Sequence, residues 1–165
     1  MDRKDNEMKL YIRQKVMTVG DKYDITDERG RIYFHVESEL LAIPARIRLF
    51  DINKNEVLLI KRNISFPLAS YEILRDGQTV AGVKSEFALF SSKITVTSDT
   101  DSFQVDGDLF SMNFTLLRNG QPFAGIHKEL IAIGDSYELD IFDDIDIALA
   151  CALVIIIDNL HHKDN

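Results

Sequence analysis

The segment that most constrains the fold of this chain is DIDIALACALVIIIDNL, which runs from Asp144 to Leu160. A helix over these residues is apolar on every side, so it belongs inside a large core or inside a bilayer. From Ile145 to Leu160 it would be about 24 Å long, whereas a membrane span needs about 20 apolar residues to cross ~30 Å of hydrocarbon. We therefore interpret residues 144–160 as a helix buried in the protein, in preference to a membrane span or anchor.

Both ends of this segment carry helix signals. Asp143 and Asp144 are placed to cap the first turn, and a negative charge at Asp146 suits the positive end of the helix dipole. Asn159 suits a stop at the other end. A buried Cys151 is expected to be an inert packing residue. The side chains expected to fill the core are those of Ile147, Leu149, Cys151, Leu153, Ile155 and Ile157.

A repeat occupies much of the rest of the chain. DGQTVAGVKSEF, from Asp76 to Phe87, returns 43 residues later as NGQPFAGIHKEL, from Asn119 to Leu130, with Gly, Gln, Ala, Gly and Glu kept in place. Weaker copies bring the total to about six units of roughly 21 to 24 residues. Units of one kind predict one repeated structure.

Each unit has the pattern of a strand, a turn and a second strand. Apolar and polar residues alternate on both sides of DERG, DINKN, RDGQ and RNGQ, which have the composition of tight turns. Asp-Gly and Asn-Gly are strong hairpin signals, because both central residues of such turns have positive φ. The pattern therefore predicts about twelve strands.

About twelve strands in up-and-down order leave two long edges unless the sheet closes into a barrel. A barrel of about eight strands is filled by its own side chains, so a wider one needs another occupant. The apolar helix has the length and diameter to fill it. The sequence thus predicts a mainly β fold: a closed antiparallel barrel of six hairpin repeats around a central hydrophobic C-terminal α-helix.

Three stretches carry a family resemblance: LYIRQKVMTVGDKYDITDERG near the start, the hairpin repeats, and GDSYELDIFDDIDIALACALVIIIDNLHH at the close. From about Met8 to His162 the chain resembles the LURP-one-related family in its short bacterial form. The resemblance implies the tubby C-terminal-like fold, a twelve-stranded barrel around a hydrophobic helix. That superfamily includes tubby proteins, which bind phosphoinositides, and phospholipid scramblases. The basic pocket of tubby proteins and the calcium motif of scramblases cannot be mapped onto these residues.

Length and composition indicate how many domains the chain forms and where they lie. With 165 residues, 45% hydrophobic and 28% charged, we expect one domain over residues 9–160, between a flexible tail at 1–8 and a tail at 161–165. The polar start MDRKDNEMKL and the single Cys151 favour a cytoplasmic location without an intrachain disulfide. A net charge of -8 argues against nucleic acid as a partner.

One concentration of basic residues is a candidate site for an anion or a lipid head group. It consists of Arg46, Arg48, Lys61 and Arg62. Arg46 and Arg48 alternate with apolar residues, so they face outward from one strand, and a hairpin return brings Lys61 alongside. The alternative is ordinary surface charge offset by nearby carboxylates such as Asp51 and Glu56, which we favour.

Other candidate chemistry is sparse. The acidic loop DTDSFQVDGD lacks the ligand spacing of a calcium loop. No motif joins any of the four histidines, His161 and His162 included, to a nucleophile, an acid or the spacing of a zinc site. The sequence therefore predicts no metal, no cofactor and no catalytic residue, and we expect the protein not to be an enzyme.

Two functions are weighed. We expect a non-enzymatic binding or interaction module, whose partner is a protein or a small apolar ligand. The alternative is a peripheral phospholipid-binding or phosphoinositide-binding protein that holds anionic head groups through the basic residues. The net charge of -8 opposes contact with an anionic membrane, so the alternative is not favoured.

Overall fold

The computed structural model describes residues 8–13, 22–39, 41–63, 69–88, 91–109, 111–129, 136–142 and 146–162. These residues form twelve strands and one helix, α1 (Ile147–His162). The strands are β1 (Met8–Arg13), β2 (Lys22–Asp27), β3 (Ile32–Glu39), β4 (Arg46–Phe50), β5 (Glu56–Asn63), β6 (Ser70–Arg75), β7 (Gln78–Ala88), β8 (Ser91–Thr97), β9 (Phe103–Asp108), β10 (Asn113–Arg118), β11 (Gln121–Glu129) and β12 (Ser136–Ile141).

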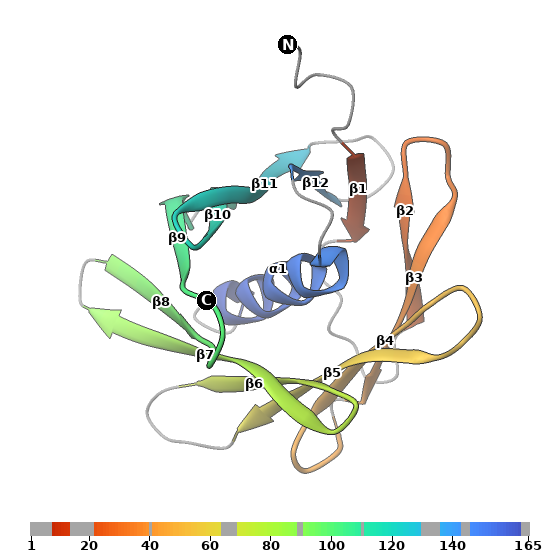
Figure 1. Cartoon of the computed structure of the whole chain (residues 1–165), viewed down its shortest axis with the longest axis horizontal. Helices are drawn as coiled ribbons and strands as arrows, with labels where there is room; N and C mark the ends of the chain where they lie inside the picture. The colour runs from red at the N-terminus through yellow and green to blue at the C-terminus, as the bar shows by residue number, and fades with distance from the viewer. Residues whose placement is uncertain are drawn as a thin grey trace.

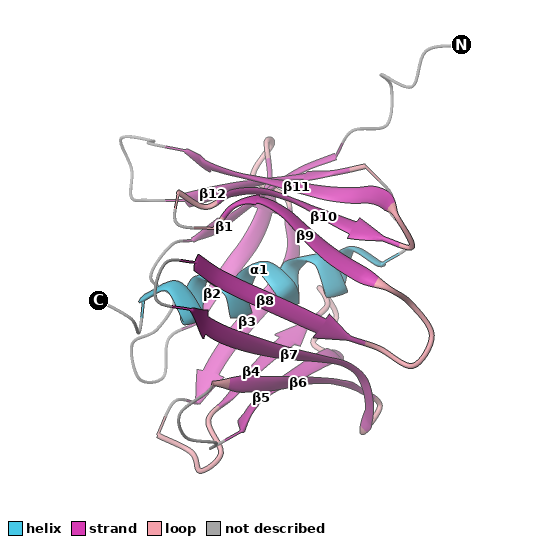
Figure 2. Ribbon diagram, turned by 90° about the vertical axis from the view of Figure 1, so that its left-hand side faces the viewer, coloured by secondary structure: helices cyan, strands magenta, loops and turns pink. Residues whose placement is uncertain are grey.

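The strands form one antiparallel sheet that curls around α1 (Figure 1). β1 pairs with β12 from Met8 opposite Ile141 to Arg13 opposite Ser136, which joins the first strand to the last. Figure 2 shows α1 running through the barrel, with strands on both sides of it. The predicted β-barrel around a C-terminal helix is therefore confirmed.

The barrel is open along one seam, between β8 and β9. Among the described residues these two strands end the hydrogen-bonded order of the sheet, although they are consecutive in sequence. Their connection is bonded to the β10–β11 turn instead: Arg118 and Asn119 donate to the carboxylate of Asp101 at 2.7 and 2.8 Å, and the Asn119 N–H donates to Ser102 O at 2.7 Å. β8 and β9 nevertheless lie in contact with each other, so the expected closure is nearly complete.

Two hairpin turns have the geometry that their sequences predict. Asp76 and Gly77 have φ of 50° and 77°, and Asn119 and Gly120 have φ of 52° and 77°. Two successive positive φ values give a turn whose twist matches that of the flanking strands. This explains why Asp-Gly and Asn-Gly join β6 to β7 and β10 to β11.

The interior of the barrel is filled by α1. Every residue from Leu149 to Leu160 is buried, and the inward-facing strand residues pack around the helix. Of the six side chains expected to fill the core, Ile147 is partly exposed and the other five are at most 4% exposed. No helix in the described ranges combines the length and hydrophobicity needed to cross a bilayer.

The ends of α1 differ from the expectation. The helix continues to His162, so part of the expected tail is helical, and Asn159 lies within the helix at 1% exposure. Packing inside the barrel outweighs the weak local preference of Asn for a helix end. The cap is Asp146, whose Oδ1 accepts the N–H of Leu149 at 3.1 Å. Asp143 and Asp144, the expected caps, lie outside the described residues.

Candidate functional site

Three of the basic residues picked out by the sequence form a patch on the outer face of β4 and β5. Ile47 and Leu49 of β4 face the core, so the alternating Arg46 and Arg48 face outward. Lys61 of β5 lies opposite Arg46 in the register and shares its face. These three residues are called the outer patch below.

Arg62, the fourth basic residue picked out by the sequence, does not share a face with the other three and is not part of the outer patch. It follows Lys61 on β5 and therefore lies on the opposite face, the face of the buried Ile60. In the register it lies opposite Tyr71, whose side chain is buried. Burial raises the pKa of Tyr71, and the charge of Arg62 opposes that rise, which agrees with the two side chains being close. The period of two along a strand separates Arg62 from its neighbour.

Carboxylates surround the outer patch. Arg48 forms ion pairs with Glu39 and with Glu56, the latter at 3.1 Å. Asp51 instead accepts backbone N–H groups of the β4–β5 turn, including that of Asn55 at 2.9 Å. One cross-strand row of the outer face consists of Glu39, Arg46, Lys61 and Glu72. This arrangement favours ordinary surface charge over a site for an anion.

Several reactive side chains are buried or hydrogen-bonded. Burial, with a contribution from the charge of Asp146, raises the pKa of the Cys151 thiol, which is fully enclosed. A buried thiol of this kind is not a nucleophile. On neighbouring strands, His35 Nδ1 lies 2.6 Å from Asp24 Oδ1. Within the described ranges, no three His, Cys, Asp or Glu side chains lie close enough together to hold a metal ion.

The carboxylates around β9 do not converge on one point. A hydrogen bond from Arg118 is the largest cause that lowers the pKa of Asp101 to about 2. Asp106 and Asp108 are exposed on β9, and Asp99 is exposed in the β8–β9 connection. Among the described residues, Asp101 pairs with Arg118, and the carboxylates of this loop do not gather into a cation site.

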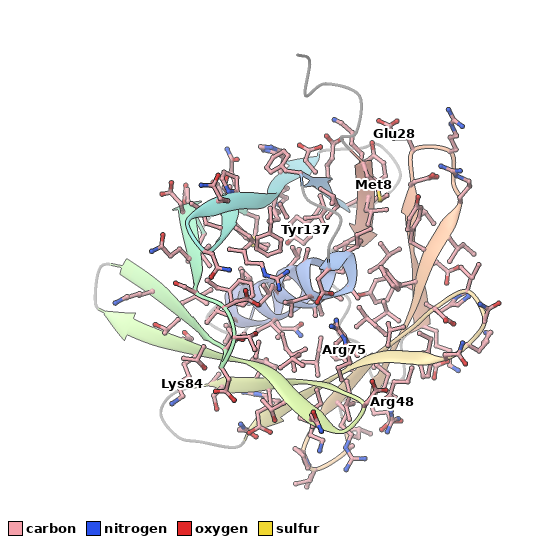
Figure 3. All side chains as sticks on the ribbon, in the orientation of Figure 1. Met8, Glu28, Arg48, Arg75, Lys84 and Tyr137 are labelled. Carbon is pink, nitrogen blue, oxygen red and sulfur yellow. The ribbon has the colours of Figure 1, made fainter. Side chains whose placement is uncertain are left out.

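A buried polar cluster lies near the end of α1. The Tyr137 hydroxyl donates to Asp158 Oδ1 at 2.5 Å, and both side chains are buried (Figure 3). Burial raises the pKa of Tyr23 well above its usual value, with smaller contributions from Cys151 and Asp158. Neither side-chain amide atom of Asn159 has a hydrogen-bond partner within the described part of the chain. The bond from Tyr137 ties the last turns of α1 to the barrel wall.

A groove of about 280 Å³ lies over β6, β7 and β8. Gly82 of β7 lines it and lies opposite Glu72 of β6 and Thr97 of β8. Lys84 and Asp99 also line it. Sequence reasoning missed this groove, although the glycine that both copies of the repeat keep was a signal for it.

Comparison with known proteins gives three results. The sequence profile described as LURP-one-related matches residues 8–158. The chain is 24% identical over 157 residues to the uncharacterized protein YxjI of Bacillus subtilis (strain 168), covering 95% of this chain and 96% of that one. An X-ray structure of a protein from Arabidopsis thaliana matches with a TM-score of 0.67 and 18% identity, over 93% of this chain and 91% of that chain. The structural match shows the same fold.

Proposed function

The chain belongs to the LURP-one-related family, and from this premise we propose that it is a non-enzymatic binding module that holds its partner on the outside of the barrel. The interior supports this choice of face. From Leu149 to Leu160 the buried helix α1 occupies the centre of the barrel. A ligand would have to displace this helix to enter, whereas the outer face is open to a partner.

The observation that carries the proposal is the groove over Gly82. It is hollowed into the outer face of a regular sheet, and charged side chains of both signs line it, Lys84 beside Glu72 and Asp99. Concave surface with a few polar groups is typical of binding sites. We therefore assign the binding face to β6, β7 and β8.

An enzymatic role has less support among the described residues. Cys151, the one thiol of the chain, is enclosed in the core. His127 lies 3.0 Å from Asn113 Oδ1 and 3.5 Å from Asp140 Oδ2, and it does not line the groove. General acid–base catalysis needs such a group within hydrogen-bond reach of a bound substrate. We propose binding without catalysis.

Lipid binding through the outer patch is the second candidate, and the ion pairs of Arg48 weigh against it. Glu39 and Glu56 already neutralise this guanidinium. A lipid phosphate would have to compete with both carboxylates. Liposome sedimentation tests this candidate separately.

The proposed binding face can be tested with a displayed library of random 12-residue peptides. The library is selected on the wild-type protein, and enriched peptides are then measured against Gly82→Leu and Gln104→Leu. A Cβ at Gly82 would lie 2.9 Å from Thr97 Oγ1, the end of an exposed side chain that can rotate away, so the first variant is expected to fold and to fill the groove. Gln104→Leu is the matched control on exposed β9.

Enriched peptides that bind wild type and Gln104→Leu equally, and Gly82→Leu at least about ten-fold more weakly, support the proposal. Peptides that bind Gly82→Leu as tightly as wild type would show that the binding face lies elsewhere. A selection that enriches nothing above an uncoated surface counts against a peptide-binding module.

A further inference from the structure

Two hairpins of the barrel are structural copies of each other. β6–β7 and β10–β11 each have a turn with two positive φ values and a bulge at the equivalent position. In each copy a glycine faces the following strand: Gly82 lies opposite Thr97 of β8, and Gly125 lies opposite Asp140 of β12. The same offset of 43 residues relates all these positions, so the two outer faces can be compared residue by residue.

In the second copy an aromatic ring covers the glycine. A Cβ placed on Gly125 would lie 3.0 Å from Cζ and 3.3 Å from Cε2 of Phe142. The Phe142 N–H donates to Phe123 O at 3.0 Å, which holds this residue beside β11. Two residues earlier, the carboxylate of Asp140 lies 3.5 Å from His127 Nε2. One short segment thus supplies both a ring and a carboxylate to this face.

The first copy has no ring, and it has no carboxylate at the position of Asp140. Its next strand also ends sooner: β8 pairs with β7 as far as Thr97 opposite Gly82, whereas β12 continues to Ile141 opposite Ala124. Asp99 stands at the position of the ring, and Thr97 stands at the position of the carboxylate. Lys84, labelled in Figure 3, stands at the position of the histidine and is exposed. No ion pair joins it to another residue within the described ranges. In the second copy, the surface above Gly125 is covered by the ring of Phe142. The equivalent surface of the first copy is the groove that Gly82 lines.

We propose that the groove over Gly82 binds an aromatic side chain of a partner polypeptide, while a carboxylate of the same segment pairs with Lys84. This inference rests on the proposed binding function and names the chemistry of its ligand. The partner's ring covers Gly82 as Phe142 covers Gly125, and the partner's carboxylate lies near Lys84 as Asp140 lies near His127.

The size and charge of the groove fit this occupant. A cavity of about 150 Å³ holds benzene, whereas pockets for whole small molecules span about 300–1,000 Å³. A groove of about 280 Å³ has room for one ring and lies just below the range for whole small molecules. Val80 contributes apolar surface to the lining. Its charged residues are Glu72, Asp99 and Lys84, so a carboxylate of the partner can pair only with Lys84. Single aromatic anchors seated in such pockets commonly dominate binding at protein interfaces.

The repeat supplies a matched pair of variants. Asp99→Phe places a ring at the sequence position equivalent to Phe142, on a residue that already lines the groove, so it should cover Gly82 from within the chain and block the groove. Asp99→Ala removes the same carboxylate and adds no ring, so it should leave the groove open. Both changes are at an exposed position, and thermal unfolding of each variant checks that the barrel is intact.

The probe is the peptide acetyl-Leu-Asp-Ile-Phe-amide, which copies residues 139–142, titrated while the backbone amide signals of residues 79–84 and 97–99 are followed by NMR. We expect these signals to shift for the wild type and for Asp99→Ala. Asp99→Phe should bind at least about ten-fold more weakly, the scale set by burial of one aromatic ring. Replacing Phe by Ala in the peptide should abolish the shifts, and replacing Asp by Asn should weaken binding about two- to five-fold.

Four results would overturn the inference. The first is the absence of shifts near Gly82 at millimolar peptide; the second is binding that Asp99→Phe leaves unchanged. The third is a set of shifts in residues 79–84 that depends on protein concentration without peptide, which would make a second copy of the chain the occupant. Library peptides that bind the groove and contain no aromatic residue would also refute the inference, while the proposed binding function would stand.

Discussion

Arg75 of β6 donates to both carboxylate oxygens of Asp146, at 2.8 and 2.9 Å, and so ties the barrel wall to the residue that caps α1 (Figure 3). Asp146 Oδ1 also accepts the N–H of Leu149 at 3.1 Å. One carboxylate therefore satisfies a free N–H of the first helical turn and neutralises a guanidinium from the wall. The Tyr137–Asp158 bond holds the other end of the helix.

The two roles of Asp146 can be separated by substitution. Asp146→Ala removes the cap and the ion pair, and should lower the free energy of unfolding by about 1–2 kcal/mol. Arg75→Gln removes only the ion pair and should cost at most about 1 kcal/mol, because partly exposed pairs contribute little; the Arg75 side chain is 39% exposed. Urea unfolding measures both values. Equal losses would contradict a separate capping role.

The middle of α1 is predicted to tolerate no charge. Leu153→Asp buries an unpaired carboxylate, which should remove several kcal/mol from a total stability of about 5–15 kcal/mol. We expect this variant to be insoluble or to lose cooperative thermal unfolding, as followed by circular dichroism. Ile147→Asp is the control, because Ile147 is partly exposed in the first turn, where the helix dipole favours a negative charge. Similar melting of both variants would show that α1 is not held in the core.

The hydroxyl of Tyr137 should contribute to stability, and that of Tyr71 should not. Tyr137→Phe takes a hydrogen bond from the buried carboxylate of Asp158 and should cost about 1–3 kcal/mol. Tyr71→Phe is the matched control, because the Tyr71 hydroxyl is buried without a hydrogen-bond partner among the described residues. Its removal should be neutral or stabilising in urea unfolding. The reverse order of the two effects would refute this account of the cluster.

The architecture was readable from the sequence because local and global signals agree. Asp76-Gly77 and Asn119-Gly120 mark tight turns whose geometry almost no other residues adopt. The apolar segment is too short to span a membrane and too uniformly apolar to lie on a surface, which left the barrel interior as its place. The seam between β8 and β9 was not predicted, because consecutive strands of a hairpin usually pair, whereas here the connection bonds to the β10–β11 turn.

The binding face was harder to predict than the fold. Lys61 and Arg62 are consecutive in sequence, which suggested that both belong to one basic cluster. Adjacent residues of a strand lie on opposite faces, so Arg62 lies apart from Lys61. The groove depends on what is missing above Gly82, where Thr97 and Asp99 stand in place of a carboxylate and a ring. A missing side chain leaves no local pattern, so only a comparison of the two repeats in three dimensions exposes it.

The lowered pKa of Asp101 predicts that wild type and an Asp101→Asn variant respond differently to acid. Its pKa in the folded protein is lowered to about 2, with the hydrogen bond from Arg118 as the largest cause, and its value in an unfolded chain is about 3.9. The ionised carboxylate therefore stabilises the fold above about pH 4, and this contribution is lost as the pH falls through about 2. Asp101→Asn keeps an acceptor for Arg118 but does not titrate. The difference in free energy of unfolding between wild type and Asp101→Asn should be constant above about pH 5 and shrink between about pH 4 and 2; a constant difference down to about pH 2 would contradict the assignment.

Liposome sedimentation decides between the two candidate functions. A basic residue near an anionic membrane contributes about 1 kcal/mol. The outer patch has three such residues, Arg48 among them already pairs with two carboxylates, and the chain carries a net charge of -8, so attraction should be marginal. We expect no salt-sensitive sedimentation with phosphatidylserine or phosphoinositide vesicles at physiological ionic strength. Changing Arg46, Arg48 and Lys61 together to Ser tests the outer patch, and Arg62→Ser is the matched control on the inner face. If wild type and Arg62→Ser sedimented while the triple variant stayed in solution, lipid binding would replace partner binding as the preferred function.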